Sequence, residues 1–420
     1  MRMKLNKPSQ LVLVSAAGLL AAMLVTACQQ FTQTLTVDFV YVASSKAAGA
    51  NSFGEINVFE INSESGFMRQ IPDSPFPSQG RNPVAETVST DYSSLFVVNQ
   101  DDNTVVQFVI GIDGKLYPNN TVNTPGVFPL AVAASKSDLF VLDTYEPLPS
   151  CNTAAPCSGS IAVYPLTAAT KTTPLVMGAP ATNIANSSNY WPLTLPSAPA
   201  DVIVPTGVAV TKSGSDVYVS AYDSSTSPNS TGYIFGFSVG SDGSLTALSG
   251  SPWAAGRQPS ALTADPTDAY LYATDYGNAD VLAYTISPAN SGSPGSLTPL
   301  SGGPFPSGNQ PAAIVADPSY PYLYVANSLD ATVTAYSMSN GALTRLGSFA
   351  TGLDPVAIGI DPSTNHFLYT ANFLGDNVNN FQLSTTAGTL VNTQYSPYGA
   401  NPQPTAVAAI PHNGTGAGVK

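Results

Sequence analysis

The fold is decided by the stretch from Pro311 to Leu346, which reads "PAAIVADPSYPYLYVANSLDATVTAYSMSNGALTRL". Short apolar runs alternate here with turn residues, which predicts four strands, at 311–316, 322–327, 332–337 and 343–346. The segments between them, "DPS", "NSLDA" and "SNGA", carry the Asp, Asn, Gly and Pro residues that favour tight turns. Four antiparallel strands per unit are typical of a β-propeller blade.

The apolar run "LYVAN" at the centre of this stretch occurs seven times along the chain. The copies begin at Val40, Leu95, Leu139, Val217, Leu271, Leu323 and Leu368. A repeat of roughly 40–55 residues built from strand-like pieces predicts a propeller or an array rather than several separate domains.

A second regularity precedes the "LYVAN" strands. The inner strands begin at Pro83, Pro129, Pro205, Pro259, Pro311, Pro355 and Pro404, and the residue two places later is always Ala or Gly. Such a restriction is expected where blades converge on an axis. The first "LYVAN" copy has no inner strand before it, and the last inner strand, Pro404–Ile410, has no copy after it. The sequence therefore predicts an all-β fold, a seven-bladed β-propeller of four-stranded antiparallel blades over residues 36–411, in which the C-terminal strand completes blade one and closes the ring.

The first residues are expected to form a signal rather than part of the fold. Arg2, Lys4 and Lys7 precede an uncharged apolar stretch of 15 residues, too short to span a bilayer as a helix. The following "VTAC" resembles a bacterial lipobox, with Cys28 as the lipidated residue; an ordinary signal peptide with an incidental cysteine is the alternative. Because Gln29 follows rather than Asp, we expect an exported lipoprotein of the outer membrane, on its periplasmic side or at the cell surface, with a signal at 1–27, a tether at 28–35 and a tail at 412–420.

The remaining two cysteines agree with export, and the charge balance bears on the possible partners. Cys151 and Cys157 lie in the loop-like segment "PSCNTAAPCSG", where a disulfide is expected and no further Cys or His suggests a metal site. The chain has 26 acidic and 13 basic side chains and a net charge of −13. This balance repels phosphate backbones, so nucleic acid is not an expected partner.

The pattern "G-x-x-P…DP…LYVAN…D-x-V-x-AY" resembles the 6-phosphogluconolactonase-like and YVTN-repeat families of seven-bladed propellers. It is carried by residues 256–284, 308–336 and 352–381, and the resemblance extends over nearly all of 36–411. The resemblance implies hydrolysis of a sugar lactone, with His, Arg and Glu side chains around a central pocket on the upper side of the ring. The only histidines are His366, in a turn, and His412, in the tail, so this chain departs from that pattern.

Two sets of side chains recur from blade to blade, and recurrence favours a structural cause. Four aromatic residues precede inner strands, at Phe76, Trp253, Phe305 and Tyr398, and we interpret them as packing between blades rather than as ligand-stacking residues. Asp and Asn residues end the "LYVAN" strands at Asn99, Asp143, Asp275, Asn327 and Asn372. They are typical turn residues, with cation binding as the alternative, although no calcium-loop spacing is present.

Residues that break the repeat are the candidates for catalysis. Glu86 stands at an inner-strand position where the other six repeats have Val, Leu or Ile. A carboxylate is costly to bury unless it is paired, and Arg81 is a candidate partner. Arg81 and Arg257 hold matching places before their prolines and could bind a carboxylate or polarise a lactone carbonyl, with Glu86 as general base. Ion pairs between these arginines and nearby aspartates are the structural alternative.

Blade three is expected to carry two insertions on the upper side. One spans about 143–158 and contains the cysteine pair, and the other spans about 177–204 and contains Tyr190 and Trp191. Insertions on one face often mark a binding face, although the two loops could simply have diverged. A partial lid is one interpretation, with Tyr190, Trp191, Asp143 and Asp275 as candidate ligand-binding residues.

Three functions remain open from the sequence. The first is an envelope-anchored propeller, expected to be monomeric, that binds a small polar or sugar-acid ligand, or an envelope protein or glycan. The second is a sugar-lactone hydrolase, and the third is a structural repeat protein. No nucleotide-binding loop, nucleophile elbow, zinc spacing or other cofactor motif is recognisable, so no cofactor is expected.

Overall fold

The computed structural model describes residues 37–45, 52–151, 154–170, 173–362 and 367–411. These residues belong to one compact unit that begins at Val37. They form β-strands and one short 3-10 helix, η1 (Ser224–Thr226). Within these ranges there is no helix with the length and apolarity needed to cross a membrane.

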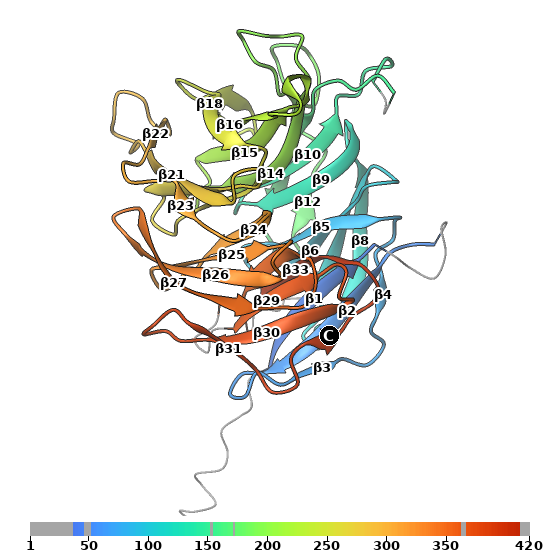
Figure 1. Ribbon diagram of the computed structural model, residues 1–420. Helices are drawn as coiled ribbons and strands as arrows, with labels where there is room; N and C mark the ends of the chain where they lie inside the picture. The colour runs from blue at the N-terminus through green and yellow to red at the C-terminus, as the bar shows by residue number, and fades with distance from the viewer. Residues whose placement is uncertain (1–36, 46–51, 152–153, 171–172, 363–366, 412–420) are drawn as a thin grey trace, which may run out of the picture. The chain divides into compact units, whose positions relative to one another are not determined.

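The strands form seven antiparallel sheets, the blades, which are arranged around a common axis (Figure 1). The strands of each blade are given from the innermost outward. Blade one consists of β33 (Pro404–Ile410), β1 (Val37–Ser44), β2 (Glu55–Asn62) and β3 (Met68–Gln70). Blade two consists of β5 (Pro83–Val88), β6 (Ser94–Asn99), β7 (Thr104–Ile110) and β8 (Leu116–Asn123), and blade three of β9 (Val127–Ala134), β10 (Asp138–Tyr145), β11 (Ser160–Thr167) and β12 (Val176–Met177). Blades four and five are β14 (Ile203–Val210), β15 (Asp216–Asp223), β16 (Thr231–Val239) and β17 (Leu245–Ala247); and β19 (Pro259–Ala264), β20 (Tyr270–Asp275), β21 (Asp280–Ile286) and β22 (Leu297–Pro299). Blades six and seven are β24 (Pro311–Ala316), β25 (Tyr322–Asn327), β26 (Thr332–Ser339) and β27 (Ala342–Ala350); and β28 (Pro355–Ile360), β29 (Phe367–Asn372), β30 (Asn377–Leu383) and β31 (Leu390–Asn392).

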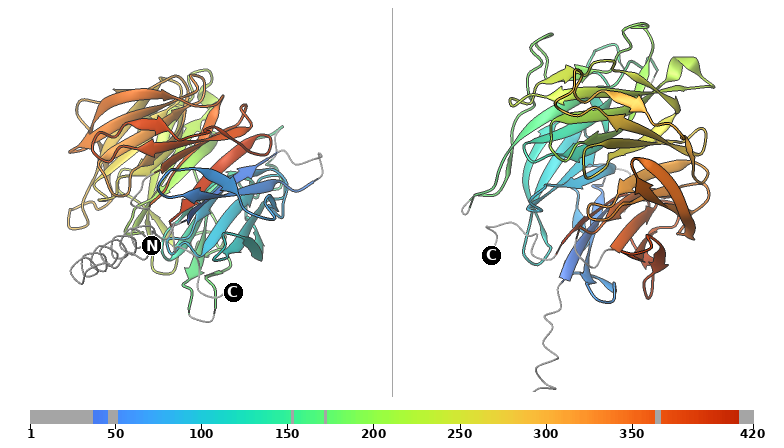
Figure 2. Two further views of the ribbon diagram at one scale, coloured as in Figure 1. Left: turned by 90° about the horizontal axis from the view of Figure 1, so that it is seen from below. Right: turned by 90° about the vertical axis from the view of Figure 1, so that its left-hand side faces the viewer.

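The ring closes in blade one, as predicted. The last strand of the chain, β33, pairs antiparallel with the first, β1, from Phe39↔Ile410 to Ser44↔Pro404. Figure 2 shows the blue and red ends of the described chain side by side in this blade. Each inner strand also contacts the inner strands of both neighbouring blades, so the sequence of blades returns to its start.

The hydrophobic core is divided among the seven junctions between blades. Each buried cluster contains side chains of two neighbouring blades; the cluster between blades one and two, for example, includes Tyr41, Val58, Val97 and Phe108. Burial of these apolar faces is the main stabilising contribution. It also explains why both faces of every blade are apolar, a pattern that a sheet with one face in water would not have.

A glycine and an Asp or Asn residue fix the start of most inner strands. We call this pair the Gly–Asx lock. Gly308 N–H donates to Oδ1 of Asn327 (3.1 Å), and a Cβ added to Gly308 would lie 2.6 Å from Cγ of that side chain. The same close approach joins Gly80 with Asn99, Gly126 with Asp143, Gly256 with Asp275, and Gly352 with Asn372, and Gly126 N–H also donates to Asp143 (3.0 Å). Blade four has Val202 and Ala221 in these two places, so both members are lost together.

The tyrosine of the "LYVAN" strand connects each of four blades to the next one. Its hydroxyl donates to the carbonyl of a glycine in the following blade, where the turn before the fourth strand has a positive φ of 67–81°. The pairs are Tyr41 with Gly114 (3.2 Å), Tyr218 with Gly295 (2.7 Å), Tyr272 with Gly341 (3.1 Å) and Tyr324 with Gly388 (3.2 Å). Each such bond is expected to contribute about 1 kcal/mol.

Several inner strands are preceded by a short strand that begins with an aromatic residue, and we call each of these short strands an aromatic bracket. β4 (Phe76–Pro77), β13 (Trp191–Pro192), β18 (Trp253–Arg257), β23 (Phe305–Pro306) and β32 (Tyr398–Gly399) each pair with the third strand of the preceding sheet. Phe76, Trp253, Phe305 and Tyr398 pack against the buried clusters of their blades. The interpretation of these four residues as packing residues is confirmed.

Candidate functional site

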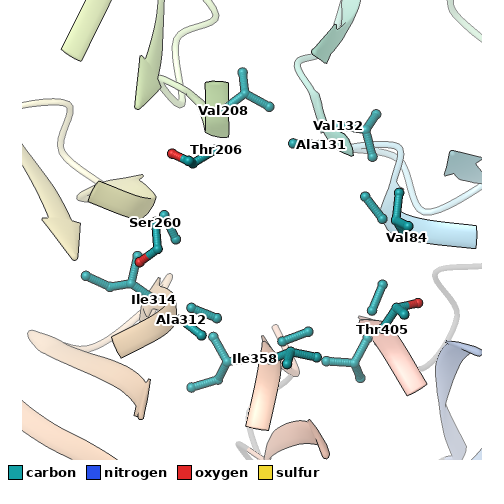
Figure 3. A pocket seen from close by; sticks show the side chains of 18 of the residues that line it. Val84, Ala131, Val132, Thr206, Val208, Ser260, Ala312, Ile314, Ile358 and Thr405 are labelled. Carbon is teal, nitrogen blue, oxygen red and sulfur yellow. The ribbon is translucent and has the colours of Figure 1, made fainter. Parts of the chain in front are cut away.

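A channel lies on the ring axis. All seven inner strands line it, and its volume is about 250 Å³. Figure 3 shows its wall from close by, with one or two labelled side chains from each inner strand. The position two residues after each proline is Ala or Gly, and all seven of these residues line the channel, which confirms the predicted crowding at the axis. We call the end of the ring where inner strands begin the upper face and the opposite end the lower face.

The few hydroxyl groups in the channel wall are already engaged. Thr206 Oγ1 donates to the Pro259 carbonyl (2.7 Å), Ser260 Oγ to the Pro311 carbonyl (2.5 Å) and Thr405 Oγ1 to the Pro83 carbonyl (2.7 Å). Each bond runs from one inner strand to the next. These hydroxyls therefore hold neighbouring blades together, and most of the channel wall is aliphatic.

Glu86 is the one acidic residue in the channel wall. Its carbon chain lines the channel, but both carboxyl oxygens are buried and have no partner in hydrogen-bonding geometry. Burial raises the pKa of Glu86 to about 8, and the backbone of Ala43 and Ala408 in blade one offsets this only in part. The carboxyl therefore lies at the junction of blades one and two and holds its proton at neutral pH.

The predicted pairing of Glu86 with Arg81 is wrong. The Arg81 guanidinium forms an ion pair with Asp102 (Nη2 to Oδ1, 2.6 Å) and also donates to the Asp101 carbonyl (3.1 Å). Asp102 additionally accepts the Arg81 backbone N–H at 2.7 Å. This aspartate follows the second strand by three residues and reaches Arg81 on the upper face, so the guanidinium is directed along the surface instead of toward the inner strand.

Arg257 is less constrained than Arg81. Its Nη2 donates to the Pro228 carbonyl at 2.9 Å, and its backbone N–H donates to Asp275 at 3.0 Å. The side chain is exposed on the upper face. Arg257 is therefore available to an anionic or carbonyl-bearing ligand to a greater extent than its counterpart in blade two.

Asp143 and Asp275 belong to the Gly–Asx lock and lie beneath the upper loops. Asp143 Oδ2 accepts from Gly126 N–H at 3.0 Å, and burial raises the pKa of its carboxyl to about 7. Burial also raises the pKa of Asp275, which accepts N–H bonds from Arg257 and Asn278. The structure thus places both aspartates where they hold turns, and it does not bring them together as a ligand-binding surface.

Trp191 was predicted to bind a ligand, and the structure contradicts this. Its side chain is 7% exposed and packs in the cluster between blades three and four. Trp191–Pro192 is a further aromatic bracket, equivalent to Phe76–Pro77, and pairs with Ile161 and Ser160 of β11. Tyr190, by contrast, is half-buried next to it, and burial together with the nearby Glu146 raises its pKa.

Both insertions of blade three lie on the upper face and contact each other. They span 146–159, between β10 and β11, and 178–202, between β12 and β14. Ser158 Oγ donates to the Asp201 carbonyl (3.1 Å), and Gly159 N–H donates to the Ile203 carbonyl (2.8 Å). Cys151 and Cys157 form the predicted disulfide, with their Cα atoms 5.5 Å apart. In Figure 1 the insertions appear in teal and green beside blades three and four.

Sequence reasoning missed an aromatic wall at this part of the upper face. In blades three and four the first two strands extend two residues above the usual level, as the pairings Val127↔Tyr145 and Ile203↔Asp223 show. The extensions carry the half-buried side chains of Phe128, Tyr145 and Tyr222. The rings of Phe128 and Tyr145 meet edge to face with centroids 6.1 Å apart. The signal in the sequence was the run "LDTY", which continues the second strand beyond its Asx residue.

Several predicted residues fall outside the described ranges. They are Cys28, His366 and His412. Among the residues that are described, no group of three or more His, Cys, Asp or Glu side chains is placed to hold a metal ion.

The comparisons with known proteins give a family match for part of the chain and a likeness of fold for the whole propeller. Residues 293–408, from β22 to β33, match the family model described as "Lactonase, 7-bladed beta-propeller". No curated protein matches the sequence.

Solved structures resemble the chain over its whole propeller. A Bacteroides fragilis protein described as a candidate 6-phosphogluconolactonase is 19% identical with a TM-score of 0.67, and the alignment covers 90% of this chain and 99% of that one. The periplasmic gluconolactonase of Pseudomonas aeruginosa is 18% identical with a TM-score of 0.65, covering 89% and 99%. A Lactobacillus plantarum protein is 15% identical with a TM-score of 0.65, covering the same shares. At these identities the likeness concerns the fold. The chain is thus a seven-bladed β-propeller that resembles the lactonase propellers throughout and matches their family over residues 293–408.

Proposed function

We propose that the protein hydrolyses a sugar lactone at the upper mouth of its central channel. The observation that carries this proposal is the match of residues 293–408 to the lactonase propeller family. In the reaction, water adds to the lactone carbonyl, the ring C–O bond breaks, and a hydroxy acid is released. The protein must accept the proton of the water and stabilise the oxyanion that forms on the carbonyl oxygen.

Glu86 is the residue we propose as the base. It is the one acidic residue whose side chain lines the channel, and its carboxyl is buried beside the channel, where burial raises the pKa to about 8 and weakens the fold. A residue that costs stability and breaks a repeat is more readily explained by a functional site than by packing. As a base, Glu86 would act in its ionised form, so turnover should increase as the pH rises through about 8.

We propose that Arg257 stabilises the negative charge that forms on the lactone carbonyl oxygen. Its guanidinium makes one hydrogen bond in the described part of the chain, whereas that of Arg81 is neutralised by Asp102. The aromatic wall of Phe128, Tyr145 and Tyr222 lies on the same upper face, and its half-buried rings suit the C–H face of a sugar ring.

The test is a pH-stat assay of the detergent-purified full chain on a panel of aldono-lactones, with the spontaneous rate subtracted. We expect turnover that falls roughly 10²-fold or more in Glu86→Gln and by roughly 10²-fold in Arg257→Gln. Arg345→Gln, on the exposed outer strand of blade six, is the matched control and should retain the rate. Full turnover in Glu86→Gln would remove Glu86 as the base, and absence of turnover on every lactone would remove the hydrolase itself. Saturable lactone binding without turnover would then favour a binding protein.

We also propose that the protein is exported and anchored by a lipid on Cys28. The basic start, the apolar stretch and "VTAC" support this, as does the disulfide Cys151–Cys157, since disulfides persist in oxidising compartments. Cys28→Ala is expected to move the protein from the membrane fraction to the soluble fraction of its host. The double change Cys151→Ala, Cys157→Ala is the control and should leave it with the membranes; release by that variant too, or membrane retention of Cys28→Ala, would contradict lipidation.

A further inference from the structure

A second cavity opens on the lower face, at the end of the inner strands that is opposite to their prolines. It lies between blades five and six and has a volume of about 440 Å³. Its walls are the turn 265–267 of blade five, the turn 317–321 of blade six, the hairpin turn at 340–341 and Lys212 from blade four. We call it the lower pocket. It shares no lining residue with the central channel.

The walls of the lower pocket combine ring faces with aliphatic surface. Tyr270, Tyr320 and Met338 are half-buried and line it, together with the three prolines of the two turns. Tyr270 is fixed in place because it packs on Gly341, whose missing Cβ leaves room for the ring. Such partly exposed, immobilised ring faces in a concavity of a few hundred cubic ångströms are typical of small-molecule sites.

The polar groups of the lower pocket fall into two classes. The carboxylates of Asp265 and Asp317 are committed to their own turns: Asp265 accepts the N–H groups of Ala269 and Tyr270 (2.9 and 2.7 Å), and Asp317 accepts that of Ser319 (2.8 Å). In contrast, the Lys212 ammonium, the Asn340 amide and the Ser319 hydroxyl make no hydrogen bond to any described residue. The pocket therefore offers donors, and an amide acceptor, that remain free for a ligand.

The charge around the lower pocket disfavours an anionic ligand. One lysine, Lys212, and two aspartates, Asp265 and Asp317, line the pocket, and a third aspartate, Asp268, accepts the backbone N–H groups of Lys212 (2.6 Å) and Ser213 (2.8 Å). Because the carboxylates outnumber the ammonium group, an anionic ligand would be repelled. Hydroxyl groups can both accept from Lys212 and donate to the Asn340 carbonyl without a net charge.

From these observations we propose that the lower pocket binds a neutral saccharide of one or two rings, with a sugar C–H face against Tyr270 and Tyr320 and its hydroxyls on Lys212, Asn340 and Ser319. The site lies on the opposite face from the proposed lactone site and uses none of its residues. It is therefore a further binding site, independent of lactone hydrolysis.

The experiment is ligand-observed NMR and calorimetry on the full chain with glucose, N-acetylglucosamine, maltose and cellobiose as probes. Glucuronate and a triproline peptide test the competing ligand classes. The variants are Lys212→Ala and Asn340→Gly; glycine tolerates the φ of +48° at position 340 and removes only the amide. Lys136→Ala is the matched control, because Lys136 holds the same turn position in blade three and lies outside the pocket. Thermal melting checks that each variant is folded.

We expect saturable binding of at least one neutral saccharide, weakened at least five-fold by Lys212→Ala and by Asn340→Gly and less than two-fold by Lys136→Ala. Lactone turnover should be unchanged in all three variants, so the two sites can be tested apart. The proposal is overturned if no neutral saccharide binds at up to roughly 20 mM, if the folded variants bind as the native chain does, or if glucuronate or triproline binds more tightly.

Discussion

Replacing Glu86 by glutamine is expected to stabilise the protein by several kcal/mol at alkaline pH and to have little effect near pH 4. In the unfolded chain a glutamate carboxyl titrates near 4.3, whereas in the folded protein the pKa of Glu86 is raised to about 8 by burial. Between these values the folded state holds a proton that the unfolded state has released. Stability therefore falls with rising pH by about 1.4 kcal/mol per unit, and the full loss, on the order of 4–5 kcal/mol, is reached above pH 8.

The measurement is urea unfolding of the native chain and of Glu86→Gln at pH 5, 7 and 9. The gap between their free energies of unfolding should widen with pH, since glutamine carries no titrating proton. Glu86→Leu, which copies Leu262 of blade five, should widen it further because no polar group remains buried. Glu64→Gln, in an exposed turn, is the control. Equal gaps at the three pH values would show that the carboxyl is not buried as described.

Truncation after Gln403 is expected to destroy the fold. It removes β33, whose residues Ala406 to Ile410 are at most 8% exposed and pair with β1 along its length. Loss of this apolar burial and of the ladder is worth on the order of 5–10 kcal/mol, which equals the whole stability of a typical domain. It also exposes β1 as an unpaired edge at the ring axis, which favours aggregation.

Circular dichroism melting and limited proteolysis measure this loss. Truncation after Pro411 is the matched control, because it removes only residues 412–420 and leaves β33 complete. A synthetic peptide of residues 404–411, added to the shorter chain during refolding, should restore part of the protease resistance. If the chain that ends at Gln403 melts like the native one, the ring does not depend on its C-terminal strand.

The strands and the closure of the ring could be predicted because the same sequence pattern recurs several times along the chain. In blade six the first two strands have the predicted bounds, 311–316 and 322–327, and the third and fourth run longer than predicted. The Gly–Asx lock was also readable, since Gly and Asx occur together in five blades and are absent together in blades one and four, where Asn401 and Ser44, and Val202 and Ala221, hold the two places. The Asp and Asn residues were instead interpreted without the glycines that they contact.

Side-chain direction near the axis could not be predicted. In all seven inner strands the register shifts just after the proline, for example between Pro83 and Ala85 or between Pro311 and Ala313. Such a bulge changes which face a residue points to. The interblade bond of Thr405 and the position of the Glu86 carboxyl against blade one both depend on it.

The predictions for Arg81 and Trp191 were wrong for different reasons. Two acidic residues could pair with Arg81, and extra residues surround Trp191 in the sequence. Arg81 had two acidic candidates, and the nearer one in space, Asp102, is the one it binds. Trp191 lies in a long link that the sequence presents as an insertion, so its equivalence to Phe76 was hidden by the extra residues around it.

The tyrosine-to-glycine bonds have a consequence for how the ring comes apart. Each of the four bonds joins a strand of one blade to a turn of the next, always in the same rotational direction. When a blade unfolds, a buried tyrosine hydroxyl of the intact blade on one side, or a glycine carbonyl of the intact blade on the other, therefore loses its hydrogen-bond partner. This loss destabilises the intact neighbour. Damage to one blade is thus expected to weaken its neighbour at these four junctions, and blades four to seven, which three of the bonds connect in series, are expected to unfold together.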